Sequence, residues 1–310
     1  MGQVRTCSEP DRFLPGDLVE VRSEAEILAT LDEKGTLEKL PFMPEMLKFC
    51  GRTFRVSRSA FKTCVDDQEM RQLDTTVFLE EVRCDGSGHG GCGRACLIFW
   101  KEAWLKPSGS THSSNGFHKP KVGRSDIVSL AQPEGQFFCQ STEILNASTP
   151  LPWWEPKQYL WDLKYNRIST VQFIQSLLIA FYNKLAHVFR LRSWRFVAGS
   201  AGDFREAPLN LQPGELVRVK SLSQIKATLD LSGKNHNLLF APTMLGFCGR
   251  VLRVQDRVEN IVLEGSPRQR KIKDTVLLEG ATCDGICHRL CPRQSFLFWR
   301  ECWLERISIS

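Results

Sequence analysis

The sequence predicts a mainly β protein with some α, built from two homologous small barrels that are joined by a helical connector. Three observations carry this prediction: an internal repeat, short segments of alternating apolar and polar residues behind Pro-Gly turns, and a basic, aromatic-rich stretch between the two copies. The chain has 310 residues, of which 42% are hydrophobic and 25% charged, as in globular rather than disordered proteins. This length corresponds to about two domains.

The internal repeat sets the domain organisation. The copies align over these ranges: 15–56 on 213–254 and, after one inserted residue, 75–105 on 274–304. About half of the aligned pairs are identical, among them FCGRTFRV against FCGRVLRV and FWKEAWL against FWRECWL. We therefore expect a first repeat at 14–106 and a second repeat at 212–306, each with the same fold.

Each repeat contains the same series of expected elements. GDLVEV and GELVRV predict a half-buried strand, because apolar and polar residues alternate behind a turn. A helix follows, with Ser23 or Ser221 as N-cap and Gly35 or Gly233 as its stop signal. PEMLKFCGRTFRV predicts a helical turn, a glycine corner and a strand, and TVFLEEVRC and CLIFWKEAWL predict two more strands. Short strands with one helix in about 90 residues favour a small barrel.

The order of these segments carries a family resemblance. The residues concerned are a methionine in the helical turn, a Gly-Arg-Val strand and a final Trp-Leu strand: Met46, Gly51, Arg55, Val56, Trp100, Trp104 and Leu105, and Met244, Gly249, Arg253, Val254, Trp299, Trp303 and Leu304. In these residues the chain resembles the SH3-like barrel repeats of the Mind-bomb/HERC2 type, over roughly 60% of its length. It also resembles a bacterial protein family with CGR-x-x-RV, CDG, H-x-x-C and FWKEAWL in the same order. The first resemblance implies tandem SH3-like barrels and a protein or peptide partner.

A cysteine- and histidine-rich loop is inserted into each repeat. The first reads Cys84-Asp-Gly-x-x-His89-x-x-Cys92 and the second Cys283-Asp-Gly-x-Cys287-His288-x-x-Cys291, so Cys-x4-His-x2-Cys occurs twice. Thiolate and imidazole are the ligands that Zn²⁺ prefers, and the Asp-Gly pair lets the chain turn back sharply. The loops therefore predict a zinc site in each repeat, with these ligands: Cys84, His89 and Cys92, and Cys283, His288 and Cys291.

The fourth zinc ligand has several candidates. Cys50 and Cys248 are the only other cysteines present in both copies, although they also fit small buried residues beside a glycine corner. The other candidates are these: Cys64 and Cys96 in the first copy, and Cys287 in the second. Four protein ligands make a structural zinc, whereas three leave an open position for catalysis. Because two equal sites more often serve folding, structural zinc is favoured, and disulfides such as one between Cys84 and Cys92 are the remaining alternative.

The recurring tryptophans are candidate partner-binding residues. They recur at a spacing of four in the last expected strand of each copy: Trp100 and Trp104, and Trp299 and Trp303. Such residues form either the barrel wall or an aromatic groove for an extended peptide. No phosphate loop, Ser/His/Asp order or dinucleotide fingerprint is present, so no catalytic residue is predicted.

The stretch between the copies is different in kind. Residues 107–150 predict a flexible linker, and residues 151–211 an aromatic-rich segment followed by an amphipathic helix at 169–191 that begins with a capping box. Between residues 106 and 212 there are 12 Lys/Arg against 7 Asp/Glu, so most of the net charge of +6 lies there. We expect the helix to pack its apolar face on the repeats, with a dimer contact or a membrane surface as alternatives.

Composition and cysteine usage limit which classes of function the sequence predicts. No apolar run reaches the ~20 residues of a membrane span, the N-terminal segment lacks the apolar core of a signal peptide, and cysteines clustered with histidine indicate a reducing cytoplasm. A net charge of +6 is too mild to indicate a nucleic-acid partner. The sequence thus predicts a cytoplasmic, zinc-stabilised tandem-repeat scaffold or protein-interaction protein. The alternative is a metal-dependent enzyme or biosynthetic accessory protein with an open metal coordination position.

Overall fold

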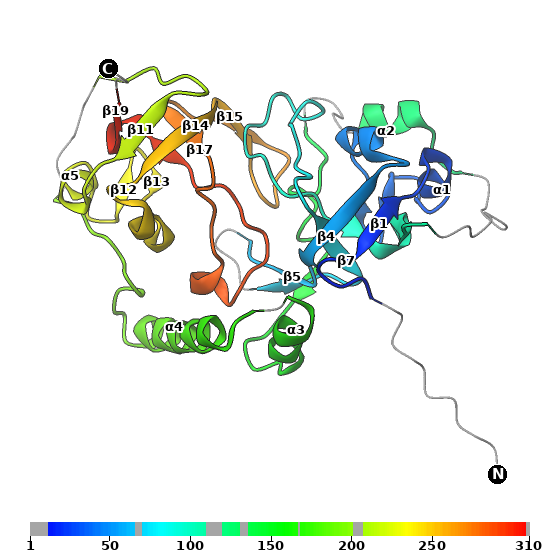
Figure 1. Cartoon of the computed structure of the whole chain (residues 1–310), viewed down its shortest axis with the longest axis horizontal. Coiled ribbons are helices and arrows are strands. Elements are labelled where there is room, and N and C mark those ends of the chain that lie inside the picture. Colours follow the sequence, from blue (N-terminus) through cyan, green and yellow to red (C-terminus); the bar gives the residue numbers. More distant parts are fainter. Residues whose placement is uncertain are drawn as a thin grey trace, which may run out of the picture.

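Two five-stranded antiparallel sheets are the largest sheets among the described residues. The structure is a computed structural model that describes residues 12–65, 70–109, 120–130, 136–166, 168–200 and 207–307. One sheet belongs to each repeat, and the helices α3 (Lys157–Tyr165) and α4 (Thr170–Val188) lie along one edge of the molecule, as Figure 1 shows. The mainly β prediction is confirmed.

The two sheets have the same strand order. The first contains β1 (Leu18–Val21), β4 (Thr53–Ser59), β7 (Thr76–Leu79), β8 (Trp100–Lys101) and β9 (Leu105–Pro107) in the order β8-β7-β4-β1-β9. The second contains β11 (Leu216–Val219), β14 (Val251–Arg257), β17 (Thr275–Leu278), β18 (Trp299–Arg300) and β19 (Leu304–Arg306) in the order β18-β17-β14-β11-β19. The register is also equivalent, because Val19 pairs with Phe54 and Val217 pairs with Leu252. Among the described residues no ladder joins the edge strands β8 and β9 or β18 and β19, so neither sheet closes into a barrel.

Short elements complete each repeat. The first has α1 (Glu24–Leu28), β2 (Thr36–Leu37), β3 (Leu40–Pro41), the 3-10 helices η1 (Pro44–Phe49) and η2 (Glu102–Trp104), β5 (Lys62–Thr63) and β6 (Arg71–Gln72). The second has α5 (Leu222–Lys226), β12 (Lys234–Asn235), β13 (Leu238–Leu239), the 3-10 helices η4 (Pro242–Phe247), η5 (Ile286–His288) and η6 (Glu301–Trp303), β15 (Asn260–Val262) and β16 (Gln269–Lys271).

The helix starts follow the sequence prediction, but the helix ends do not. Ser23 and Ser221 each cap their helix through a capping box, as predicted. The prediction that Gly35 and Gly233 stop these helices is wrong, because the helices end at Leu28 and Lys226. The two glycines instead occupy tight turns with φ of 71° and 72°, ahead of β2 and β12.

The four repeated tryptophans lie in the hydrophobic cores. Each has 0% exposed surface, and the predicted last strand is broken by η2 or η6 between the two tryptophans of a pair. The indole N–H of Trp104 donates to Thr30 Oγ1 at 3.1 Å, and that of Trp303 donates to Thr228 Oγ1 at 2.9 Å. The assignment of partner binding to Trp100, Trp104, Trp299 and Trp303 is therefore wrong, because side chains without exposed surface do not contact a partner. They are residues of the two hydrophobic cores.

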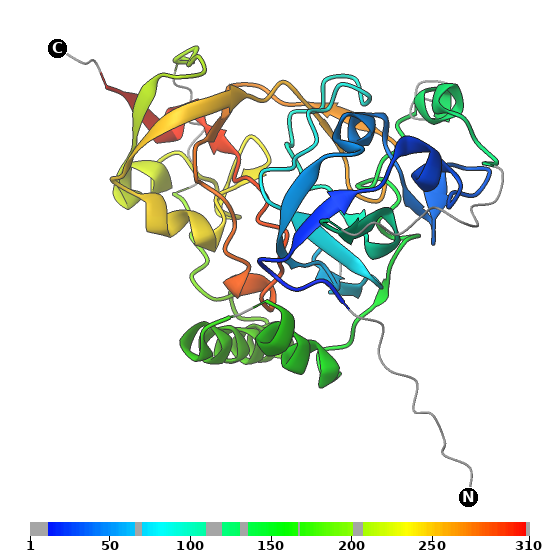
Figure 2. The ribbon, with the colours of Figure 1, turned by 45° about the vertical axis from the view of Figure 1, so that its right-hand side comes forward.

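The two repeats are joined by reciprocal contacts. The backbone N–H of Val262 in β15 donates to Cys92 Sγ at 3.3 Å, and the backbone N–H of Cys64 after β5 donates to Cys291 Sγ at 3.2 Å. In the same reciprocal way, Arg94 donates to the Val262 carbonyl and Arg293 to the Cys64 carbonyl, at 3.2 and 3.0 Å. Figure 2 shows β15 reaching toward the first repeat. Each Cys/His loop is thus held by a short strand of the other repeat.

Part of the segment predicted as a flexible linker is packed structure. Val122, Ile127 in α2 (Arg124–Leu130), Cys139 and Ile144 are buried in the first core, and β10 (Thr149–Pro150) pairs with β6. Gln140 donates to the carbonyls of Pro41 and Phe99 at 3.1 and 2.8 Å and accepts the Phe99 N–H at 2.8 Å. The described residues of 120–150 therefore pack against the first repeat, and Phe137 and Ser141 also hydrogen-bond the second repeat.

Helix α4 forms where the sequence predicts it, but its orientation differs. Its capping box with Ser169 and Gln172 is confirmed. The prediction that the apolar face packs on the repeats is wrong: Ser176 and Ala186 are the buried residues of the helix, while Leu178 and Phe181 are more than 60% exposed. Within the described part of the chain, no helix combines the length and the apolar character that a bilayer crossing requires.

Candidate metal centre

Backbone contacts join the two ends of the loop from Cys84 to Cys96, and the chain turns sharply at Gly86. The N–H of Cys84 donates to the Cys96 carbonyl at 2.9 Å, and Arg83 bridges to Leu97. Gly86 has φ of 71°, and a Cβ on it would lie 2.2 Å from the Cys92 carbonyl oxygen. Only glycine fits this close approach, so the sharp turn predicted from the Asp-Gly pair is present. Gly285 in the second repeat has the same geometry, with 2.3 Å to the Cys291 carbonyl oxygen.

Three side chains in the first repeat gather into a group that could hold a metal ion. They are Glu45 from η1 and Cys84 and His89 from the loop, and their ligand atoms all lie within 4.8 Å of one another. His89 Nδ1 lies 2.6 Å from Glu45 Oε1, which also accepts the Gly88 N–H at 2.9 Å, while Cys84 Sγ lies 3.8 Å from that oxygen. Glu45 and His89 are almost completely buried. Two of the residues, Cys84 and His89, are ligands predicted from the sequence.

The ionisation of this group follows from burial and from its own contacts. Burial alone would raise the pKa of Glu45, but its hydrogen bond and charge interaction with His89, together with the Gly88 N–H, outweigh burial, and the pKa is lowered. Burial, with the Glu45 carboxylate beside it, raises the pKa of Cys84. Glu45 is therefore ionised, and Cys84 is a neutral thiol until a cation stabilises its thiolate.

The two ring nitrogens of His89 have different surroundings. Nδ1 is held by Glu45, whereas Nε2 is buried and has no hydrogen-bond partner among the described residues. Buried polar atoms are nearly always paired, so an unpaired one requires an explanation. A histidine that donates one N–H to a carboxylate presents its other nitrogen as a metal ligand, which is the usual arrangement around protein-bound zinc.

The residues of the loop surround a cavity of about 30 Å³. Its lining includes a histidine and four cysteines: Cys84, His89, Cys92, Cys96 and Cys139. Burial raises the pKa of the Cys92 thiol, and it raises the pKa of the Cys139 thiol to about 12. A volume of this size accommodates about one water molecule or one ion. The predicted ligand Cys92 and the candidate fourth ligand Cys96 line the same small cavity as Cys84 and His89. They are not part of the group whose ligand atoms all lie within 4.8 Å of one another, which contains Glu45, Cys84 and His89.

Sequence reasoning missed two members of this site, Glu45 and Cys139. Glu45 has Thr243 at the equivalent position of the second repeat, so a search for ligands shared by both copies passes over it. Cys139 lies outside both aligned ranges, in the segment expected to be a linker. The capping and packing of 136–150 bring it to the cavity, and no local pattern signals this.

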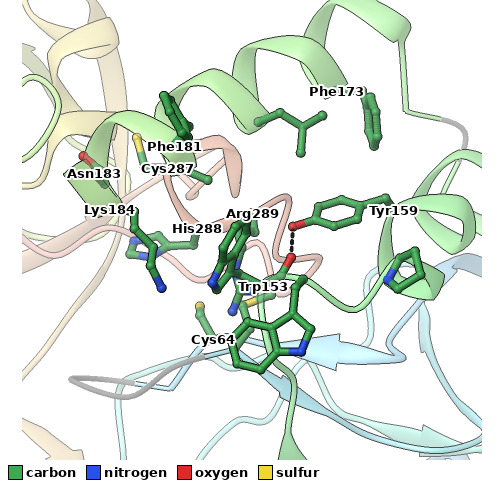
Figure 3. Close-up of a pocket in the computed structure, with 15 residues that line it drawn as sticks. Cys64, Trp153, Tyr159, Phe173, Phe181, Asn183, Lys184, Cys287, His288 and Arg289 are labelled. Carbon is green, nitrogen blue, oxygen red and sulfur yellow. Dashed lines mark hydrogen bonds between the residues drawn. The ribbon is translucent and has the colours of Figure 1, made fainter. Parts of the chain in front are cut away.

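The second repeat does not gather its predicted ligands in the same way. Among the described residues, the group at Glu45 is the one in which three ligand atoms lie within 4.8 Å, so Cys283, His288 and Cys291 do not form an equivalent group. The thiol of Cys64 hydrogen-bonds Cys291, and this contact together with the Arg293 charge outweighs burial and lowers the pKa of Cys291. Cys287 and His288 face a separate groove of about 920 Å³, where Figure 3 shows them beside Lys184.

The remaining candidate ligands lie apart from the cavity. Cys50 packs against the first hydrophobic core and Cys248 against the second, and burial raises the pKa of Cys50 to about 11. Both thiols are half-buried, and neither lines the cavity at Cys84 and His89. The eleven cysteines that the structure describes are all free thiols, so no disulfide between Cys84 and Cys92 is present.

Comparison of the chain with models of protein families, with curated proteins and with solved structures gives no match. The assignment of the site therefore depends on its geometry and chemistry alone.

Proposed function

We propose that the protein is a zinc-stabilised, tandem-repeat scaffold of the cytoplasm that binds a protein or peptide partner. The observation that carries the metal part is the buried His89 at an ion-sized cavity lined by four thiols. Glu45 orients this histidine, and its Nε2 has no partner among the residues that the structure describes. The scaffold part is supported by two repeats without a catalytic motif. The SH3-like class is supported by the shared strand order and by the 3-10 turn between the last two strands of each sheet.

Zinc fits this donor set better than other common metals. Imidazole nitrogen and thiolate sulfur suit zinc, whereas calcium and magnesium select oxygen ligands. We assign Cys84, His89 and Cys92 as ligands, with Cys96 or Cys139 as the fourth, and Glu45 as the carboxylate that orients His89. At 2.6 Å, the Glu45–His89 contact is a hydrogen bond, which leaves no room for an ion between these two atoms.

A structural role is supported by the enclosure of the site. His89 is 1% exposed and Glu45 is 4% exposed, and the cavity has room for an ion but not for a substrate beside it. The site also joins three separate parts of the chain, which are η1, the loop and the segment around Cys139. Metal binding at such a junction contributes directly to the free energy of folding.

A different observation favours the alternative function, which is that of an enzyme or biosynthetic accessory protein with an open metal coordination position. Cys64, Cys287 and His288 line the groove of about 920 Å³, which is large enough for a small-molecule ligand. A metal held by these residues would be open to solvent and therefore exchangeable.

Metal content separates the two functions. Elemental analysis of the untagged full chain, with thermal melts before and after chelation, should give one tightly held zinc and a large fall in Tm when it is removed. Cys84→Ser should lose the metal, and Cys50→Ser, which alters a half-buried thiol outside the cavity, should retain it. Protein without metal contradicts the zinc assignment. One exchangeable ion, retained in Cys84→Ser but lost in Cys287→Ser, supports the enzyme.

A further inference from the structure

Helix α4 exposes its apolar face and buries its small and polar face. Ser176 Oγ donates to the Ile286 carbonyl at 3.0 Å, and Ser176 and Ala186 are the buried residues on the side that meets η5. The rest of the helix surface carries these exposed apolar residues: Val171, Ile174, Leu177, Leu178, Phe181, Tyr182, Leu185, Val188 and Phe189. Two of them, Leu177 and Phe181, also line the groove of about 920 Å³. The helix is therefore oriented with its apolar residues toward solvent, whereas a helix that packs on a core directs such residues inward.

The apolar surface continues beyond α4. In α3, Leu160 is 64% exposed, and ahead of it Trp153 and Trp154 are 47% and 67% exposed. The rings of Tyr159 and Phe173 lie 6.2 Å apart, which joins α3 to α4, and Figure 1 shows both helices along the same edge. Trp153, Trp154 and Phe173 line one groove together with Leu177 and Phe181 of α4. Monomeric proteins rarely expose a large apolar patch unless it binds something.

The charge along α4 and the segment that follows it has one sign. The sequence has no aspartate or glutamate between Asp162 and Asp203, and Lys184, Arg190, Arg192 and Arg195 follow one another along α4 and the segment after it. Among the described residues, no carboxylate forms an ion pair with any of these four cations. Lys184 instead lies over Trp153 at 5.0 Å, and Arg192 lies over Phe196 at 5.3 Å. The apolar face is thus bordered by uncompensated positive charge and by tryptophans.

We propose that this face, formed by α4, the segment to Trp194 and the exposed residues of α3, docks in the plane of a membrane surface that contains anionic lipids. Exposed Leu, Ile and Phe side chains with Lys/Arg and Trp at their border match the acyl–headgroup boundary of such a bilayer. A symmetric contact with a second copy is less favourable, because it brings these cations against their own equivalents without a carboxylate between them.

Vesicle binding tests the proposal with the full, metal-loaded chain. We expect flotation with vesicles of phosphatidylcholine and phosphatidylserine, much weaker flotation with phosphatidylcholine alone, and loss of binding at high salt. Leu178→Glu should abolish binding, whereas Leu231→Glu should not. The two leucines are both 64% exposed, but Leu231 lies in the turn after α5 of the second repeat rather than on α4. The pair therefore matches the chemical change and isolates its position.

A second pair of variants tests the charge. Arg190→Gln with Arg192→Gln should weaken partitioning roughly five-fold per charge removed, and Arg218→Gln with Lys226→Gln in the second repeat should leave it unchanged. Neither pair changes the core, and circular dichroism checks folding. Absence of binding to either vesicle, or equal effects of the matched variants, overturns the proposal. A different result would support self-association instead of membrane binding. In that case the wild-type protein sediments as a dimer, Leu178→Glu makes it monomeric, and neither protein binds vesicles. Metal content is measured independently, so these outcomes do not depend on the zinc assignment.

Discussion

The two repeats share their architecture and differ in the chemistry of their loops. Strand order, register, helix caps and the glycine under the loop are equivalent in both, down to the Cβ clash that Gly86 and Gly285 avoid. Two positions around the metal group differ between the repeats. Glu45 of the first repeat corresponds to Thr243 of the second, and Cys96 corresponds to Ser295. Without a carboxylate to orient it, His288 faces the groove rather than a buried cavity. Residues that determine the fold are thus retained, while one substitution in η4 accompanies the loss of the metal group.

The largest expected difference between the repeats concerns the metal. Cys84→Ser should release the zinc and destabilise the protein strongly, because structural zinc binding amounts to roughly 10–16 kcal/mol in small domains. Cys283→Ser, the same change at the equivalent position, should retain the metal and lower stability by about 1–3 kcal/mol through its buried contacts alone. Zinc content and chemical unfolding of the two variants measure this. Equal metal loss in both would mean that the repeats hold equal sites.

A smaller effect is expected from the residue that distinguishes the copies. Glu45→Gln keeps the shape of the side chain but removes the charge that holds His89 Nδ1, so zinc affinity should fall by about 10–100-fold. Competition with a chromophoric chelator measures the affinity, and Thr243→Val is the matched control, with no expected change. Because the pKa of folded Glu45 is lowered, its contribution is present above the ordinary carboxyl pKa and is lost as the pH falls through the folded value. A loss far beyond a hundred-fold would make Glu45 a direct ligand.

Local features of the fold could be predicted from the sequence. The first strand of each repeat, the N-caps at Ser23, Ser221 and Ser169, and the turn at Gly86 depend on a few neighbouring residues, and all are found in the structure. The last predicted strand of each repeat is instead interrupted by η2 or η6. The contacts that could not be predicted join distant residues. Cys139 reaches the cavity through packing of a segment outside the repeats, and Cys64 meets Cys291 across the two repeats.

The orientation of α4 shows a second limit of sequence patterns. The periodicity of its apolar residues predicts that the helix has an apolar face, and this is confirmed. Periodicity does not specify what covers that face, because core and bilayer have the same preference for Leu and Phe. The buried side of α4 is instead decided by small residues that allow a close approach to η5, as the hydrogen bond from Ser176 shows.

The smallest difference between the repeats is expected at their helix caps, and it should depend on pH. Ser23→Ala and Ser221→Ala each remove one side of a capping box and should each cost about 1 kcal/mol at neutral pH. The partner of Ser23 is Glu26, whereas that of Ser221 is Gln224.

Burial would raise the pKa of Glu26, but hydrogen bonds from Ser23 and Arg22 outweigh burial and lower the pKa. The stabilisation by Glu26 is therefore complete above the ordinary glutamate pKa and is lost as the pH falls through the folded value. Calorimetric Tm shifts should show the cost of Ser23→Ala shrinking in acid while that of Ser221→Ala stays constant, since an amide does not titrate. Parallel pH profiles for the two variants would show that the carboxylate adds nothing to the cap, and that the two helices are held by the serine hydroxyl alone.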